Sequence, residues 1–397
     1  MQTTPRSLID EYTAKGWWGE ETLNSLFREA AAEQPQRLAL ADPPNRRDLV
    51  GGPVERLTYT ELEQRIASLS VALYAHGIRE HDIVVVQLPN IAELPILYLT
   101  LARLGAIISP VPVQYGRHEL GRINEALDAS AFISTRSFEG RDLLGEHGPV
   151  FEGCTLFAIA SESAGAAVNL ADPVLDTADT AACSNYIEQR KPSSNDIFTI
   201  CWTSGTTGTP KGVPRSFNHW LAIAVGVHDL AGLRDGDVLL NPFPMVNMGS
   251  IGGFLFTWLE CRGTLVLHHP VDLPVFLRQL ASEKINYTIA PPALLTMLLK
   301  NDALLEDVDL SHLRAIGSGS APLPTWMVEG YEKQFGIAIL NNFGSNEGMC
   351  LVSGPQDGRT RPRGTGRAVP AFRRRRIFVE QSYRHHGEDQ VGRPGIQ

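Results

Sequence analysis

The stretch 82-DIVVVQLPNIAELPILYLTLARLGAIISPV-111 predicts the fold class of this chain. It begins with a β-branched run typical of a strand buried on both faces, and residues 91–105 then follow helical spacing. A second apolar run at residues 106–113 is expected to be another buried strand. A strand, a helix and a strand in this order indicate a right-handed crossover between parallel strands.

The alternation continues on both sides of this stretch. Thr60 and Glu63 form a capping-box pattern near the start of a helix that we expect within residues 57–78. Beyond the central stretch, residues 117–130 have the spacing of an amphipathic helix, and residues 131–135 are expected to form a strand. The amino-terminal half is therefore predicted to be α/β.

A second series of strands and helices follows a weakly patterned region at about residues 140–195, in which we expect one or two strands. The expected strands are 196–204, 237–244, 263–269, 286–292 and 337–344, and the expected helices are 215–233, 272–285, 293–300 and about 324–335. The same rhythm repeats at residues 313–323. Ligands in such sheets lie outside the carboxyl ends of the strands, which here precede the loops after Trp202, Ile316 and Leu340.

The predicted fold is two doubly wound, mostly parallel α/β sheets packed together. A chain of 397 residues is too long for one small core. We expect an amino-terminal subdomain at residues 1–185, a second subdomain with the ligand site at 186–355, and an irregular basic tail at 356–397.

Composition is that of a soluble globular protein, with 43% hydrophobic and 20% charged residues. The net charge of −9 disfavours nucleic-acid binding. Five widely spaced cysteines without a C-x-x-C pair suggest free, mostly buried thiols. No secretory signal is evident, and charged residues and prolines interrupt the most apolar region, so no transmembrane segment is expected and we predict a cytoplasmic protein.

The tail differs from the rest of the chain. Residues 356–397 contain ten Arg, including 373-RRRR-376, and no Lys. Such a segment fits a disordered basic tail, an arm for RNA or another anionic surface, or translation of a GC-rich gene in the wrong reading frame. The abrupt loss of the α/β pattern favours the frameshift interpretation.

The stretch 203-TSGTTGTPKG-212 is suited to phosphate. Small residues let several backbone N–H groups converge, hydroxyls add donors, and Lys adds a positive charge. It is not a Walker loop, because no second Gly directly precedes Lys211 and Gly212 stands where that motif has Ser or Thr. The loop therefore predicts a nucleotide site of another kind.

Three stretches resemble motifs of the adenylate-forming, or AMP-binding, superfamily in the expected order: 203-TSGTTGTPKG-212, 317-GSGSAPL-323 and 342-NFGSNEG-348. With residues 82–111, which resemble the amino-terminal lobe of these enzymes, the likeness covers about residues 10–355. It implies an AMP-forming carboxylic acid–CoA ligase that uses ATP, Mg²⁺ and, as co-substrate, coenzyme A.

The resemblance also implies roles for individual residues. Thr203, Lys211 and Glu347 would be catalytic, and Glu347 would also hold the metal. The residues expected to bind the nucleotide are Thr203, Ser204, Gly205, Thr206, Thr207, Gly208, Lys211, Ser320, Ala321, Pro322, Asn342, Phe343, Gly344, Ser345 and Asn346. Phe343 would stack on adenine. The expected acid pocket is Asn247, Met248, Gly249, Ser318 and Gly319.

Two positions depart from the family pattern. Asn346 stands where the family usually has Thr, which replaces a hydroxyl by an amide that can still donate to phosphate. Asn247 stands where the family commonly has His, so Asn247, Met248 and Gly249 could be packing residues at a helix start as well as an acid-binding wall.

The family's ribose-binding Asp and its small mobile domain with a reactive Lys cannot be located after Pro355. We therefore expect adenylation reduced by at least 10²-fold, as after removal of one charged stabiliser of a transition state. The alternatives are an aryl-acid ligase that loads a carrier protein, a non-catalytic nucleotide-binding fragment, and a basic-tailed RNA-binding protein. A homodimer is possible.

Overall fold

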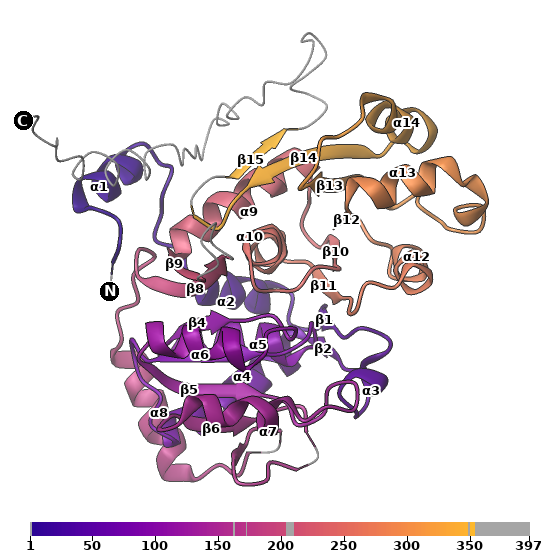
Figure 1. Ribbon diagram of the computed structural model, residues 1–397. Coiled ribbons are helices and arrows are strands. Elements are labelled where there is room, and N and C mark those ends of the chain that lie inside the picture. The colour runs from indigo at the N-terminus through magenta and orange to yellow at the C-terminus, as the bar shows by residue number, and fades with distance from the viewer. Residues whose placement is uncertain (1, 162, 172, 204–209, 348–349, 354–397) are drawn as a thin grey trace, which may run out of the picture.

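The computed structural model describes residues 2–161, 163–171, 173–203, 210–347 and 350–353. Two β-sheets dominate these residues, and Figure 1 shows them one above the other with the helices packed around them. The seven-stranded sheet has the order β7 (Val168–Asn169), β6 (Thr155–Ala158), β5 (Ala129–Ser134), β3 (Ile83–Gln87), β4 (Ile107–Pro110), β8 (Ile197–Thr203) and β9 (Lys211–Ser216).

The eight-stranded sheet has the order β15 (Cys350–Ser353), β14 (Ala338–Gly344), β13 (Ala315–Gly319), β12 (Tyr287–Ile289), β10 (Val238–Asn241), β11 (Thr264–Leu267), β1 (Leu38–Ala41) and β2 (Arg56–Thr58). Most neighbouring strands in both sheets are parallel, and β1–β2, β8–β9 and β14–β15 are antiparallel. The predicted fold class, two mostly parallel sheets with helices, is confirmed. The predicted tail at residues 356–397 lies outside the described residues.

Helices connect most of the parallel strands. The helices are α1 (Arg6–Ala14), α2 (Leu23–Glu33), α3 (Arg46–Leu49), α4 (Tyr59–Ala75), α5 (Glu93–Leu104), α6 (Arg117–Ala126), α7 (Leu143–His147), α8 (Thr177–Gln189), α9 (Phe217–Ala231), α10 (Met248–Ser250), α11 (Thr257–Glu260), α12 (Leu273–Ser282), α13 (Pro292–Lys300) and α14 (Thr325–Phe335). A π-helical turn, Ile251–Phe256, joins α10 to α11.

One apolar core joins the two sheets. Its largest cluster includes Leu239 and Leu265 of the eight-stranded sheet together with Val84 and Phe198 of the seven-stranded sheet. Helix α5 belongs to this core and is buried at every position except Arg103, which explains why its sequence is apolar all round. The shared core holds the two sheets as one packed body.

Sheet membership does not follow the order of the chain. Strands β1 and β2 lie in the same sheet as β10 to β15, whereas β8 and β9 complete the sheet that contains β3 to β7. The sheets therefore cross the predicted subdomain boundary at residues 185/186 in both directions. The subdomain division itself stays a prediction.

The capping box of α4 lies at Thr58 and Glu61, not at the predicted Thr60 and Glu63. Thr58, the last residue of β2, caps the helix: its Oγ1 accepts the Glu61 N–H at 3.3 Å, and the Glu61 carboxylate accepts the Thr58 N–H at 2.8 Å. Thr60 lies in the first turn, and its hydroxyl donates to the Pro35 carbonyl. The pattern Thr60–Glu63 was wrong by two residues because Thr58 is the residue with extended backbone.

Other expectations are met in part. The region 140–195 contains the two strands β6 and β7, but also helices α7 and α8 that were not predicted. Cys154, Cys183, Cys201 and Cys261 are free, and the last three are buried. Within the described part of the chain, no helix has the length and apolar content of a membrane span.

Candidate active site

A cavity of about 910 Å³ opens beyond the carboxyl ends of β10, β12, β13 and β14. Its walls come from residues of β12, β13, β14 and β15, from the segments that follow β10, β12, β13 and β14, from α9, and from α10 with the π-helical turn after it. Among the described residues that line it, none carries a formal charge at neutral pH. Its volume is within the range of small-molecule sites, and its position is the one expected for a ligand of an α/β sheet.

Glycines make room where β13 meets β14. A Cβ atom on Gly319 would lie 2.0 Å from the Asn342 carbonyl oxygen, and one on Gly317 would lie 2.6 Å from both Asn342 Nδ2 and the Tyr287 hydroxyl. The next residue, Ser320, has a φ of 68° and turns the chain away from the strand. Gly319, Ser320, Ala321 and Pro322 then form one wall of the cavity.

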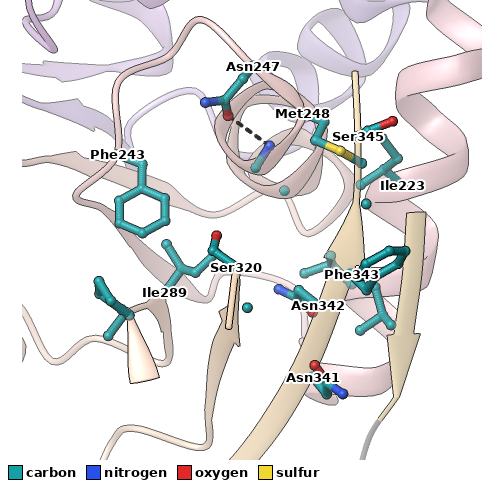
Figure 2. Close-up of a pocket in the computed structure, with 18 of the residues that line it drawn as sticks. Ile223, Phe243, Asn247, Met248, Ile289, Ser320, Asn341, Asn342, Phe343 and Ser345 are labelled. Carbon is teal, nitrogen blue, oxygen red and sulfur yellow. Dashed lines mark hydrogen bonds between the residues drawn. The ribbon is translucent and has the colours of Figure 1, made fainter. Parts of the chain in front are cut away.

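The facing wall begins at the cap of α10. Asn247 Oδ1 accepts the Gly249 N–H at 3.0 Å, and Figure 2 shows this bond across the cavity from strand β14. Asn247, Met248 and Gly249 all line the cavity. The Asn247 side chain is thus a helix cap and the residue is also part of the wall, so the two interpretations of this segment do not exclude each other.

Strand β14 supplies the most exposed aromatic group of the site. Phe343 is 61% exposed and lines the cavity with Asn342, Gly344, Ser345 and Asn346. An exposed ring at a cavity is suited to stacking on a planar ligand. Ser318 does not line the described cavity: it is fully buried, and its hydroxyl donates to the Ala290 carbonyl at 2.8 Å.

Strands β8 and β9, which flank the predicted phosphate loop in the sequence, pair as an antiparallel hairpin. Thr203 and Lys211 face each other in the register of these antiparallel strands. Lys211 was expected in a loop but begins a strand, and its side chain is exposed. Ser204, Gly205, Thr206, Thr207 and Gly208 lie outside the described residues.

Glu347 lies beside the base of this hairpin. Burial alone would raise the pKa of its carboxyl, but its backbone N–H, the neighbouring side chains of Thr203 and Ser345 and the charge of Arg215 together lower the pKa below its ordinary value. Glu347 is therefore ionised at neutral pH. The hairpin and the predicted metal ligand lie together next to Asn346, which lines the cavity and donates to the Trp202 carbonyl.

A family model described as "AMP-binding enzyme" matches residues 27–387. The chain belongs to this family. The AMP-binding chain is 24% identical over 301 residues to 4-coumarate–CoA ligase-like 2 of Arabidopsis thaliana, covering 75% of this chain and 53% of that protein. It is 25% identical over 361 residues to pyochelin synthase PchD of Pseudomonas aeruginosa, covering 88% and 61%. It thus spans about half to three-fifths of the length of these relatives.

The fold of this AMP-binding chain is also that of solved structures. The apo structure of MbtA from Mycobacterium smegmatis superposes with a TM-score of 0.70 at 23% identity, covering 88% of this chain and 62% of that one. The likeness shows a shared fold. The resemblance on which the sequence analysis rested is confirmed.

A magnesium ion fits the residues of this AMP-binding chain. Within its described part, no cluster of three or more His, Cys, Asp or Glu side chains could hold a metal alone. Magnesium bound with a nucleotide commonly takes one or two carboxylates, substrate phosphates and water. The ionised Glu347 beside the hairpin can supply one such carboxylate.

One charged residue beside the site, Arg215, was not predicted from the sequence. Arg215 is only 5% exposed, and its Nε donates to the Asn346 carbonyl at 2.8 Å. The sequence pattern that could have identified it is the two-residue period of a strand, since Lys211, Val213 and Arg215 share one face of β9. A strand was not predicted at these residues. The cavity residues Tyr287 and Asn341 were also missed, because strand pairing decides their place.

Proposed function

We propose that this chain is an AMP-forming carboxylic acid–CoA ligase. ATP and a carboxylic acid would give acyl-AMP and pyrophosphate, and the thiol of coenzyme A would then take the acyl group. The observation that supports the proposal is the juxtaposition of the β8–β9 hairpin with the ionised Glu347, next to Asn346, which lines the same cavity as Phe343.

The chemistry requires two anions to approach, because a carboxylate attacks the α-phosphate of ATP. Lys211 and the hydroxyls and N–H groups of residues 203–208 would bind the phosphates and stabilise the departing pyrophosphate. Glu347 would hold a magnesium ion, which supplies charge neutralisation when bound. Phe343 would stack on adenine, and Ser320, Ala321 and Pro322 would follow the edge of the base.

The acid would occupy the part of the cavity near Asn247, Met248 and Gly249, together with Gly319. Charged side chains are absent from the described lining, so the body of the acid is expected to be uncharged. Ser318 would act from behind this wall, through its bond to the Ala290 carbonyl, rather than by contact with the acid.

ATP–pyrophosphate exchange over a panel of uncharged aliphatic and aromatic acids tests the proposal. We expect exchange that depends on one class of acid and on Mg²⁺, and a loss of at least 10²-fold in Glu347→Gln, which removes the charge but keeps the shape. Glu329→Gln is the matched control, because Glu329 is an exposed carboxylate of α14 paired with Lys333. Exchange that is equal in the Glu347→Gln variant and the wild type would reject the proposal.

A carrier protein is the second candidate acceptor. The relative named pyochelin synthase matches 88% of this chain, and two relatives named CoA ligases, from Rhodococcus jostii and Streptomyces carzinostaticus, match the same share, so coverage favours neither acceptor. Transfer of labelled acid to coenzyme A, compared with transfer to a phosphopantetheinyl carrier protein, separates the two. Calorimetry that shows ATP and acid binding without either transfer would identify a non-catalytic nucleotide-binding protein instead.

A further inference from the structure

Asn346 connects three separate segments of the site. Its Oδ1 accepts the Met248 N–H at 2.9 Å, and its Nδ2 lies 3.4 Å from the Trp202 carbonyl, to which it donates. Its own carbonyl accepts a hydrogen bond from Arg215 Nε at 2.8 Å. Asn346 is 9% exposed, so water competes little for these bonds.

Each of these partners belongs to a different part of the proposed site. Met248 begins α10 and lines the wall expected to contact the acid. Trp202 directly precedes Thr203 at the base of the hairpin, and Arg215 lies on the returning strand β9. Glu347 is the next residue after Asn346. One side chain and one buried guanidinium thus join the acid wall, the hairpin and the metal-binding carboxylate.

We propose that Asn346 and Arg215 are positioning residues that fix Glu347 relative to the Met248 wall, so that acid binding and Mg²⁺–ATP binding depend on each other. The inference rests on the proposed ligase function. It changes the predicted role of Asn346, whose amide is used within the protein and not on a phosphate. We call this set of hydrogen bonds the Asn346 junction.

The geometry explains why the residue is Asn. Its amide carries an acceptor and a donor on separate atoms, and these serve the Met248 N–H and the Trp202 carbonyl at the same time. A Thr hydroxyl sits one bond closer to the backbone and offers a single oxygen. Thr at this position therefore cannot make both bonds without movement of α10 or β8.

The test uses the full chain and the variants Asn346→Ala and Asn346→Thr, with Arg215→Lys as a variant that keeps the charge. Asn124→Ala is the control, because Asn124 also donates a side-chain hydrogen bond, to the Val150 carbonyl at 3.0 Å, in the region of α6. Pyrophosphate exchange gives three quantities: the acid KM, the Mg²⁺ concentration for half-maximal rate, and kcat. Hydrogen–deuterium exchange reports on the segments 197–203 and 243–250 without ligands.

We expect the acid KM and the half-maximal Mg²⁺ concentration to rise together, each about tenfold, in both Asn346 variants, as for the loss of one or two buried hydrogen bonds. Arg215→Lys should raise the half-maximal Mg²⁺ concentration, since Lys cannot reproduce the Nε contact. Deuterium uptake should become faster in both segments for the Asn346 variants. Asn124→Ala should change none of these quantities.

The inference would be overturned if kcat alone fell while the acid KM and the half-maximal Mg²⁺ concentration stayed within twofold of wild type. A merely structural role lowers only the amount of competent enzyme, which changes kcat and neither of these two values. If the wild-type chain shows no pyrophosphate exchange, the proposed function fails and deuterium uptake decides the Asn346 junction. Unchanged uptake in Asn346→Ala would then reject the junction, and faster uptake in both segments would support it.

Discussion

Replacement of Arg46 by Met tests how the two sheets are held together at residues far apart in sequence. Arg46 is buried, and its guanidinium donates to the Asp42 carboxylate at 2.9 Å and to both oxygens of Glu93 at 2.8 and 2.5 Å. Asp42 follows β1 of the eight-stranded sheet, and Glu93 begins α5 beside the seven-stranded sheet. Arg46 therefore bridges the segments that leave the two sheets.

The expected cost follows from what the substitution leaves behind. Two buried carboxylates would lose their shared cation, and the loss of one partner of a buried ion pair costs about 3–5 kcal/mol. Burial already raises the pKa of Asp42 to about 6, despite the opposing charge of Arg46. With an unfolding entropy of roughly 2.1 cal/mol/K per residue, a loss of about 4 kcal/mol lowers the Tm of a chain of this length by about 5 °C.

Thermal unfolding followed by circular dichroism measures the effect at pH 8. Arg56→Met is the matched control, because Arg56 makes two hydrogen bonds to Glu283, at 2.8 and 2.9 Å, on an exposed surface. An exposed pair is worth about 1 kcal/mol or less, so this variant should change the Tm by little more than 1 °C. Equal shifts in the two variants would refute the argument that burial makes the Arg46 cluster important.

Three further predictions concern single groups. The pKa of Asp42 in the folded chain, about 6, lies above its ordinary value of 3.8, so the folded chain binds this proton more tightly than the unfolded chain does. The free energy of unfolding should therefore fall by about 3 kcal/mol as pH rises from 4 to above 6. Asp42→Asn should remove that part of the pH dependence in urea titrations. Gly319→Ala should destabilise the folded chain by about 1–3 kcal/mol, because its Cβ atom would clash with Asn342. Gly226→Ala is the control in the same titrations: it lies in open space on α9 and should stabilise the folded chain by up to about 1 kcal/mol. Phe343→Ala should raise the KM for ATP roughly tenfold with little change in acid KM, as for loss of one stacked base, and an unchanged KM would place adenine elsewhere.

Local pattern was enough to predict many of the core strands and helices, but not helix α2, which packs in the same core. The βαβ unit at residues 82–111 appears as β3, α5 and β4, because β-branched runs and helical spacing each report burial within a few residues. Strands β1 and β2 were missed because they are short, and pairing with β11, more than 200 residues away, stabilises β1. Pairing between residues so far apart cannot be detected from the pattern of a few neighbouring residues.

The candidate site shows the same division. The cavity residues Ser320, Phe343 and Asn247 were predictable from motifs at strand ends and at a helix start. Arg215 and the role of Asn346 were not, because both depend on hydrogen bonds between β8, β9, α10 and the end of β14. A sequence motif indicates which atoms are present, whereas the fold decides which of them remain available to a ligand.

A crystal structure with a nonhydrolysable ATP analogue and Mg²⁺ tests the central claim most directly. The account predicts that the triphosphate lies against the hairpin between Thr203 and Lys211, that Glu347 ligates the metal, and that adenine stacks on Phe343. A nucleotide bound away from this hairpin, or a metal with no contact to Glu347, would contradict it.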